Sequence, residues 1–322
     1  MPCVVSAIIC THNRANYLSR ALDSLVCQSL PVDQYEILVV DNASTDGTAS
    51  LVREYQARYP HLRYLREDNL GLSIARNLGW KEAKGDYVAF LDDDAAACHE
   101  WLETLLEVFE RITPTPGFIG GKVALDWEIA RPAWLTDKML SPLAYLDYGD
   151  FARYLKNEYL WGVNIAFPRA LLESTGGFAV NLGRKGECLI SNEETLLQDK
   201  LCAMGYQGYY QPEARVVHLV HRSRLRKSWY RRRYFWQGYS DVFSLISDDA
   251  PVVEKTFLSL LKAVWALLCR LKKGYKWLLP YKKFNSLRYQ LEVANKIGSV
   301  VAWYRLLFFP ERYCHSRVVK DD

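Results

Sequence analysis

Three consecutive aspartates, Asp92, Asp93 and Asp94, directly follow a short apolar run over residues 87–91. The run is rich in residues that favour β-strands, so it predicts a buried strand whose carboxyl end carries the three acids. Ligands of open α/β sheets bind at that end of the strands. Mg²⁺ and Mn²⁺ prefer carboxylate and phosphate oxygens as ligands, so the acids could hold such an ion against a diphosphate. A solvated acidic turn is the alternative interpretation.

Two further segments carry groups that could act together with these acids. Glu193 and Glu194 open an apolar pattern with helical spacing, which places both carboxylates in the first turn of a predicted helix. Acidic residues at that position also stabilise a helix through its dipole, so the pair alone does not establish chemistry. His218 alternates with apolar residues in the strand-like segment 214–220 and is either a metal ligand or a satisfied strand residue. His221 competes with it for the ligand role.

The first hundred residues must position these groups, and they alternate between strand and helix patterns. Four segments predict strands: the apolar runs 4–10 and 87–91, the mainly apolar segment 35–40 and the short segment 62–66. Between segments 4–10 and 35–40, Leu18, Leu22 and Leu25 recur at helical spacing. Helices are also expected around residues 51–55 and 75–83. Such alternation is typical of βαβ units and a mostly parallel sheet.

The region between residues 113 and 164 is richer in Pro and Gly and loses its periodicity. We therefore expect it to be irregular and to lie at the surface.

No stretch of the chain reaches the roughly 18–20 uninterrupted apolar residues that a membrane span needs. The N-terminal apolar run lacks the basic lead and the cleavage-like site of a secretory signal.

Composition divides the chain into two regions. The 322 residues are 50% apolar, enough for one large domain with an appendage or for two modest domains. Residues 1–222 hold 21 Lys and Arg against 29 Asp and Glu, whereas residues 223–322 hold 20 against 8. The two regions are therefore expected to have different partners.

Eight cysteines lie scattered without the spacing of a metal site or a disulfide scaffold, which favours a reducing, cytoplasmic compartment.

Four segments in combination resemble the nucleotide-sugar-dependent glycosyltransferases of family 2: SAIICTHNR (6–14), VVDNASTDG (39–47), NLGLSIARN (69–77) and GDYVAFLDDD (85–94). They look like the family's first strand with its T-x-N-R turn, its second-strand signature, and its run into the D-x-D metal site. The resemblance implies an α/β GT-A fold, with a Rossmann-like, mostly parallel central sheet flanked by helices. It implies a catalytic domain over residues 1–222, followed by an α-helical extension over residues 223–322.

By this resemblance, nine residues bind the nucleotide or the donor: Thr11, Asn13, Arg14, Asp41, Asn69, Gly71, Arg76, Asp92 and Asp93. Asp41 would contact the base, with a turn or helix-capping role as the alternative. Arg76 would supply positive charge to the diphosphate, which bare carboxylates repel and reach only through a metal. UDP is the nucleotide that the family favours.

The resemblance also assigns a metal site. Asp94 is expected to be the direct ligand and His218 a further one. Asp92 would lie toward the ribose or uridine, and the register within the three aspartates stays open. Mixed carboxylate and imidazole ligation suits Mn²⁺ somewhat better than Mg²⁺, and either ion fits.

The general base is expected at Glu194, with Glu193 as its neighbour and second candidate. The family more commonly has Asp at the second position, so the carboxylate of Glu194 reaches about one methylene further. A single base opposite the leaving diphosphate implies one in-line displacement that inverts the anomeric centre. Trp161, Gly162 and Asn164 resemble the segment that borders the sugar and the acceptor, although Trp161 fits a core aromatic equally well.

Basic and aromatic residues are interleaved over residues 223–322, a pattern open to three interpretations. It suits an amphipathic region on an anionic membrane, nucleic-acid binding, or a helical cap with a solvated basic face. We favour a helical cap that also touches the membrane, because no recognised nucleic-acid-binding module accompanies the charge. The expected location is the cytoplasm, with a peripheral contact at the cytoplasmic face of the inner membrane.

The sequence thus predicts an inverting, metal-dependent glycosyltransferase of polysaccharide biosynthesis. It would move a sugar from a nucleotide-diphosphate sugar, with UDP favoured, to a glycan or a lipid-linked acceptor. A non-catalytic GT-A scaffold or binding subunit at a membrane glycan-assembly complex is the alternative from a different class. A nucleotidyltransferase shares the architecture, but the Gly-rich, Lys-containing first turn of that class is missing from the sequence.

Overall fold

The computed structural model describes residues 3–245, 253–271 and 283–309. Contacts between residues divide the chain into two compact units. The first unit comprises Met1–Ala130, Thr136–Ala179 and Glu193–His221, and the second comprises Arg131–Leu135, Val180–Asn192 and Arg222–Asp322. The second unit therefore takes in two short segments from within the region 1–222.

The first unit holds all the strands of the described residues. They are β1 (Val5–Thr11), β2 (Tyr35–Asn42), β3 (Leu62–Glu67), β4 (Tyr87–Asp92), β5 (Ala95–Ala97), β6 (Phe118–Gly120), β7 (Val123–Trp127), β8 (Arg153–Tyr154), β9 (Asn164–Pro168), β10 (Gly208–Tyr210) and β11 (Val216–Val220). Its α-helices are α1 (Ala15–Val26), α2 (Thr48–Arg58), α3 (Leu72–Glu82), α4 (Trp101–Arg111), α5 (Arg169–Thr175) and α6 (Glu193–Ala203). Two short 3₁₀ turns, Asp137–Met139 and Ser141–Leu143, complete the unit.

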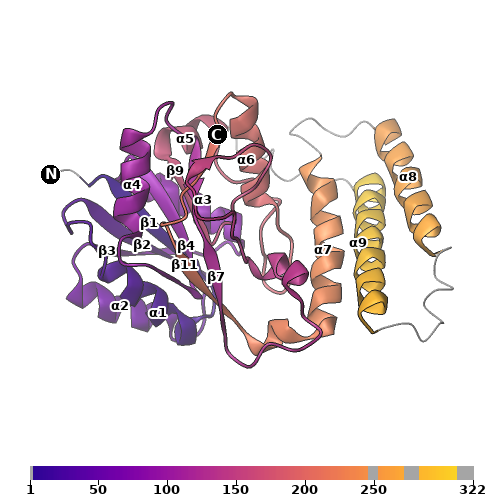
Figure 1. Ribbon diagram of the computed structural model, residues 1–322, viewed down its shortest axis with the longest axis horizontal. Helices are drawn as coiled ribbons and strands as arrows, with labels where there is room; N and C mark the ends of the chain where they lie inside the picture. The colour runs from indigo at the N-terminus through magenta and orange to yellow at the C-terminus, as the bar shows by residue number, and fades with distance from the viewer. Residues whose placement is uncertain (1–2, 246–252, 272–282, 310–322) are drawn as a thin grey trace. The chain divides into compact units, whose positions relative to one another are not determined.

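Eight of these strands form the main sheet, in the order β3-β2-β1-β4-β9-β6-β10-β8. The strands β3, β2, β1 and β4 run parallel, each to its neighbour. Strand β9 then pairs antiparallel with both β4 and β6. The predicted α/β class, with a mostly parallel sheet and helices around it, is confirmed in this unit (Figure 1).

The burial of apolar side chains explains why these segments fold this way. Strands β1 and β2 are almost wholly buried, as continuous apolar runs in a sheet covered on both faces should be. Helix α1 buries Leu18, Ala21, Leu22 and Leu25, a single stripe at helical spacing. Helix α3 packs on β1 and β2, and α4 packs on β1 and β6. Strands and helices of the first unit therefore share one hydrophobic core.

The register of the parallel strands brings the predicted site residues to one edge of the sheet. Thr11 pairs with Asp41 across β1 and β2, and Cys10 pairs with Asp92 across β1 and β4. Parallel strands end at a common edge, so side chains from three strands meet there. Ligands of open α/β sheets bind at this carboxyl edge.

A second sheet of three strands, in the order β5-β11-β7, adds residues from a distant part of the chain to this edge. Strand β5 begins directly after Asp94 and pairs antiparallel with β11, so that Ala95 lies opposite His218. The backbone N–H of Leu219 donates a hydrogen bond to the Asp94 carbonyl at 2.8 Å. This pairing fixes the histidine beside the aspartates.

The region between residues 113 and 164 differs from the expectation of an irregular segment. It contains the strands β6, β7 and β8, which are three, five and two residues long. Strands this short do not show a measurable alternation of apolar residues in the sequence. Strand β7 matters for the site because it pairs in parallel with β11.

The described helices of the second unit are α7 (Lys227–Ser244), α8 (Val253–Leu271) and α9 (Lys283–Phe308), preceded by the 3₁₀ turn Arg222–Leu225. Helix α9 packs against both α7 and α8 (Figure 1). Glycines allow α7 and α9 to approach closely, because a Cβ on Gly298 would collide with the Phe235 carbonyl oxygen. None of the helices in the described part of the chain is both long and apolar enough to cross a membrane.

Gly298→Ala is expected to lower the melting temperature, because the added methyl group must push the α7 and α9 backbones apart. Overpacking of this kind typically costs about 1–3 kcal/mol. Circular dichroism melting would measure the effect. The neighbouring change Ile297→Ala, at a position that is 40% exposed, is the matched control and should have little effect. Equal melting temperatures for wild type and Gly298→Ala would contradict the close helix contact.

Candidate active site

The carboxyl edge of the sheet gathers three groups that can bind a metal ion. Asp92, Asp94 and His218 each offer one ligand atom, and these atoms lie within 4.8 Å of one another. Asp92 ends β4, Asp94 precedes β5, and His218 lies on β11, which pairs with β5. Asp94 and His218 are buried and Asp92 is half-buried. A metal ion bound by these three residues would therefore be partly accessible to solvent.

The hydrogen bonds of His218 fix which ring nitrogen faces the aspartates. His218 Nδ1 lies 2.9 Å from the Leu143 carbonyl oxygen, which can only accept, so Nδ1 carries the proton. His218 Nε2 lies 3.1 Å from Asp94 Oδ1. Two such acceptor atoms repel unless a cation, either a proton or a metal ion, lies between them. An imidazole oriented through its other nitrogen in this way is a common arrangement for a metal ligand, so the residues fit a divalent ion.

The second oxygen of Asp94 is held by two other residues. Arg14 Nη1 lies 3.1 Å and His221 Nε2 lies 2.9 Å from Asp94 Oδ2, and these two nitrogen atoms are 2.9 Å apart. Burial opposes the charge of Arg14, but the carboxylates of Asp93 and Asp94 outweigh it and raise the pKa of the guanidinium. His221, the competing ligand candidate, thus contacts the same aspartate as His218 but from the side of Arg14. This clamp fixes the Asp94 carboxylate.

Asp93 makes a different contact from its two neighbours. Its Oδ2 accepts a hydrogen bond from the Thr11 hydroxyl at 2.8 Å. Asp93 and Asp94 lie in the turn between β4 and β5, and Asp93 is not among the three residues whose ligand atoms gather at the candidate metal site. Burial raises the pKa of the Asp93 carboxyl to about 7, although Arg14 acts against the shift. Asp93 is therefore a supporting residue of the site and not one of the candidate metal ligands.

Arg76 connects the metal-ligand group to the helix that carries the two glutamates. It is buried, with Nη1 2.9 Å from Glu193 Oε1 and Nη2 3.4 Å from Asp92 Oδ1. Burial disfavours the charged guanidinium, but Glu193, Asp92 and Glu194 outweigh that effect and raise the pKa of Arg76. Nη2 also donates to the Gly162 carbonyl at 3.3 Å. A Cβ at Gly162 would lie 2.5 Å from that nitrogen, so only glycine leaves room for the guanidinium.

The two glutamates at the start of α6 therefore differ in their surroundings. Glu193 shares its charge with Arg76, which makes it a poor proton acceptor. Glu194 Oε2 is buried and has no hydrogen-bond partner among the described residues, a feature that Glu193 Oε2 shares, so the ion pair of Glu193 with Arg76 is what distinguishes the two residues. A carboxylate oxygen of this kind can take a proton from an incoming hydroxyl.

Asp41 lies buried at the end of β2 within a polar cluster. It accepts hydrogen bonds from the Ser44 backbone N–H at 2.9 Å and from the Tyr64 hydroxyl at 2.7 Å, and Arg66 Nη1 lies 3.6 Å away. Neither Tyr64 nor Arg66 was predicted to belong to the site. The sequence shows them two residues apart on the predicted strand 62–66, but only the pairing of β3 with β2 brings them to Asp41.

The remaining donor residues lie in the turns beside this cluster. Asn13 is in the left-handed conformation, with φ of 53°, and its side-chain oxygen accepts from the Thr45 backbone N–H at 2.8 Å. Asn42, which the sequence analysis also missed, joins two predicted residues. Its amide donates to the Asn69 carbonyl and its oxygen accepts from the Gly71 backbone N–H, both at 2.7 Å. These bonds hold the turns that end β1, β2 and β3.

The residues predicted for the acceptor have different environments. Trp161 is half-buried, and its indole N–H donates to the Tyr145 carbonyl at 3.2 Å. The Asn164 side chain is fully engaged inside the protein: it accepts from the Trp101 indole at 2.9 Å and donates to the Ala214 carbonyl at 2.7 Å and to the Lys122 carbonyl at 3.3 Å. We therefore assign Asn164 a structural role and leave it out of the proposed acceptor site.

Two solved glycosyltransferases share the fold of this chain, which is the GT-A fold. A solved mannosyltransferase from Pyrobaculum calidifontis, in complex with GDP-Man and Mn²⁺, aligns with a TM-score of 0.58 at 23% identity, covering 97% of this chain and 90% of that one. Residues 1–349 of S. aureus TarS, in complex with UDP, align with a TM-score of 0.52 at 17% identity, covering 94% and 91%. At these identities the alignments establish the shared fold.

The protein belongs to glycosyl transferase family 2, whose model matches residues 6–176. A relative from Haloferax volcanii, a glucosyl-dolichyl phosphate glucuronosyltransferase, is 28% identical over 269 residues. The match covers 82% of this chain and 84% of the relative. The family resemblance seen in the sequence is thereby confirmed, and so is the assignment of the protein as a transferase of glycan biosynthesis.

When no divalent metal is present, Asp93→Asn is expected to raise the free energy of unfolding, and to raise it more at pH 8 than at pH 5. A folded-state pKa of about 7 lies above the ordinary value of 3.8, so the folded protein holds a proton that the unfolded chain releases near pH 4. The free energy of unfolding of the wild type therefore falls as pH rises from about 4 to about 7. Asparagine keeps an oxygen for Thr11 and cannot ionise.

Melting temperatures in the presence of EDTA at the two pH values would test this prediction. Asp86→Asn, a change at an exposed carboxylate just before β4, is the control. The same difference between Asp93→Asn and wild type at both pH values would contradict the burial of a titrating Asp93.

Proposed function

We propose that the protein is an inverting, metal-dependent glycosyltransferase that uses a nucleotide-diphosphate sugar. The observation that carries the proposal is the position of Asp92, Asp94 and His218 at the carboxyl edge of the sheet, linked through Arg76 to the helix with the two glutamates. Such a transferase needs a site for the nucleotide, a counter-charge for the diphosphate and a base for the acceptor hydroxyl. Each of these three needs can be met by groups on one edge of the first unit.

The nucleotide would bind over the ends of β1, β2 and β3, in the neighbourhood of Asp41, Asn13 and Asn69. Asp41 is held by Tyr64 and by a backbone N–H, which fixes its carboxylate to accept from a base or a ribose. We propose a UDP-sugar as the donor, with Thr11, Arg14 and Gly71 in the turns around it. Support comes from the fold shared with TarS in complex with UDP, while the mannosyltransferase in complex with GDP-Man makes GDP the first competitor.

Asp92, Asp94 and His218 would hold Mn²⁺ or Mg²⁺. When bound, the ion would neutralise charge that develops on the departing diphosphate. The imidazole nitrogen favours Mn²⁺ over Mg²⁺. Arg14 and His221 position Asp94, and the buried Arg76 adds positive charge beside Asp92.

Glu194 would act as the general base. Its carboxylate takes the proton of the acceptor hydroxyl while that oxygen forms the new bond to the anomeric carbon and the nucleoside diphosphate leaves from the opposite side. One displacement inverts the anomeric centre, and no bond to the enzyme forms. Glu193 orients the site through its ion pair with Arg76. Trp161 and Gly162 would border the sugar and the acceptor.

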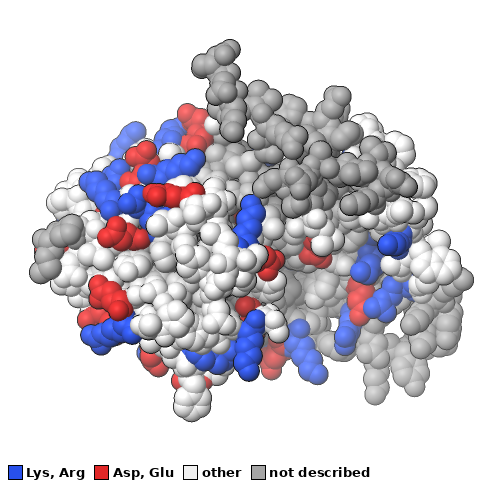
Figure 2. Space-filling model, turned by 90° about the horizontal axis from the view of Figure 1, so that it is seen from above, with Lys and Arg blue, Asp and Glu red and all other residues white. Residues whose placement is uncertain are grey.

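We propose a lipid-linked glycan as the acceptor, at the cytoplasmic face of the membrane. The relative from Haloferax volcanii, named for a glucosyl-dolichyl phosphate, supports such an acceptor. Residues 1–222 would form the catalytic domain, and the basic residues of 223–322 would provide a peripheral membrane contact. Nucleic acid is not expected as a partner, because no recognised nucleic-acid-binding module accompanies the basic residues. Figure 2 shows one face of the protein, on which the acidic and basic side chains of the described residues lie interspersed.

Asp94→Ala and Glu194→Gln should separate donor binding from transfer. Asp94→Ala removes a metal ligand and should abolish the metal-dependent rise in melting temperature with the preferred nucleoside diphosphate. Glu194→Gln removes only the proton acceptor, so it should keep that rise and lose transfer by at least about a hundredfold. The measurements are thermal shifts with UDP, GDP, CDP and dTDP, with and without Mn²⁺, and sugar release from the matching donor.

The exposed change Glu213→Gln, on the same unit but outside the proposed site, is the control for loss of a carboxylate. Full transfer by Glu194→Gln would remove Glu194 as the base. A metal-dependent shift that survives in Asp94→Ala would remove the metal assignment.

A further inference from the structure

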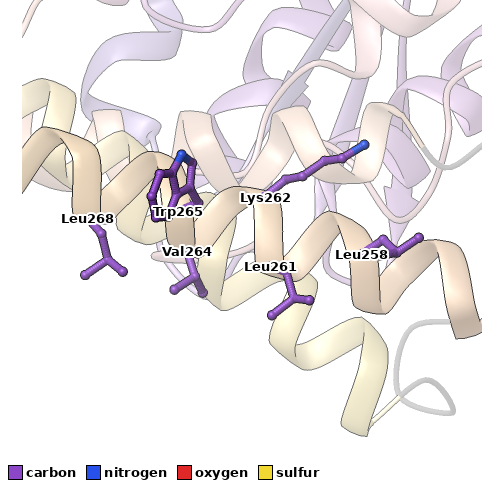
Figure 3. Close-up of a pocket in the computed structure, with 6 residues that line it drawn as sticks. All are labelled: Leu258, Leu261, Lys262, Val264, Trp265 and Leu268. Carbon is purple, nitrogen blue, oxygen red and sulfur yellow. The ribbon is translucent and has the colours of Figure 1, made fainter.

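Helix α8 of the second unit carries a row of large apolar side chains that are exposed. Trp265 is 64% exposed, and Leu258, Leu261 and Leu268 are each about half exposed. Together with Lys262 and Val264, these residues line an open hollow on the surface of the helix (Figure 3). Exposed apolar residues gathered on one face mark a contact site more often than scattered ones do.

The spacing of these residues gathers them on one side of the helix. At 100° per residue, Leu258, Leu261, Trp265 and Leu268 fall within one arc of about 80°. In Figure 3, Leu261, Val264 and Leu268 project from the same side of the ribbon. Val264 widens the arc to about 120°, which is enough to bury a continuous apolar strip of surface. We refer to these four residues and Val264 as the α8 apolar face.

The opposite side of α8 is held by α9. Thr256 is buried, the Tyr289 hydroxyl donates to the Arg270 carbonyl at 3.0 Å, and Arg270 pairs with Glu292 at 2.9 Å. Since one side of α8 is fixed to protein, the helix can bury its other side only by lying flat against a partner.

Charge indicates what kind of partner fits. The sequences of α8 and α9 hold seven Lys and Arg against two Asp and Glu. Lys262 is exposed at the border of the α8 apolar face, and its amine can reach beyond the face while its stem packs on it. A second copy would bring one basic helix against another, which like charges oppose. An anionic lipid surface attracts the same basic residues and takes up the apolar side chains, with Trp at the boundary.

We propose that the α8 apolar face docks on an anionic membrane, with the helix lying in the plane of the lipid head groups. The choice of a bilayer rests in part on the proposed function, because a lipid-linked acceptor is reached from the membrane surface. The docking itself requires no donor, metal or acceptor. A test of lipid binding alone therefore separates a failure of this inference from a failure of the proposed reaction.

The test is flotation of the full-length protein with vesicles of phosphatidylcholine and phosphatidylglycerol, and with vesicles of phosphatidylcholine alone. The wild type is expected to float with the anionic vesicles and to be released by salt. The triple change Leu261→Ser, Trp265→Ser and Leu268→Ser should lower the partition coefficient by about tenfold or more, because the three side chains then bury little apolar surface. Circular dichroism would verify that the variant is folded.

Leu245→Ser is the matched control, since Leu245 is 76% exposed at the end of α7, outside the α8 apolar face. It should bind vesicles like the wild type. A second variant, Lys262→Glu, keeps the apolar face and should weaken binding to anionic vesicles only. Unchanged flotation of the folded triple variant would overturn the proposal. So would a wild type that stays off the vesicles and forms a dimer that the triple change dissociates.

Discussion

The Asp94 carboxylate is the group on which the arrangement of the site depends. It is buried, and a buried charge is tolerated only when opposite charge and hydrogen bonds compensate it. His218 lies at one of its oxygens, and Arg14 and His221 lie at the other. These partners come from the turn after β1 and from β11 and the residue that follows it, so segments far apart in the sequence must come together before the carboxylate is compensated. The same requirement brings an imidazole to the acidic edge of the sheet.

Arg76 provides the second constraint, because it couples the acidic edge to the start of α6. Its guanidinium lies between Asp92 and Glu193, and it needs the space that Gly162 leaves. Glu193 is therefore paired with Arg76 within the protein, whereas Glu194, one residue further, is the proposed base. The two adjacent glutamates thus have different surroundings, although their chemistry is the same.

The parts that the sequence predicted well are those that local patterns determine. Strands β1, β2 and β4 are largely apolar, and the three aspartates lie at the end of β4 and just after it, so their position at the sheet edge follows from the fold class. The register within the three aspartates was left open, because it depends on where β4 ends and β5 begins. The structure places Asp92 and Asp94 with His218, and Asp93 with Thr11.

Long-range pairing accounts for what the sequence did not predict. Strand β7 is short and carries no clear period, yet it holds β11 and thereby His218. Tyr64 can contact Asp41, and Asn42 can hold the turn at Asn69, only when β3 lies beside β2. Asn164 resembled an acceptor residue by its position in the sequence, but the packing of Trp101 and two carbonyl groups around it engages its whole amide.

The central claim is that Asp92, Asp94 and His218 bind one divalent ion together. Titration of Mn²⁺ into the protein, followed through the electron paramagnetic resonance signal of the free ion, tests it directly. We expect one Mn²⁺ per chain in the wild type and an affinity lower by at least about tenfold in His218→Ala. His99→Ala, a change at a histidine outside the group, should leave the affinity unchanged. Equal affinities for wild type and His218→Ala would contradict the account.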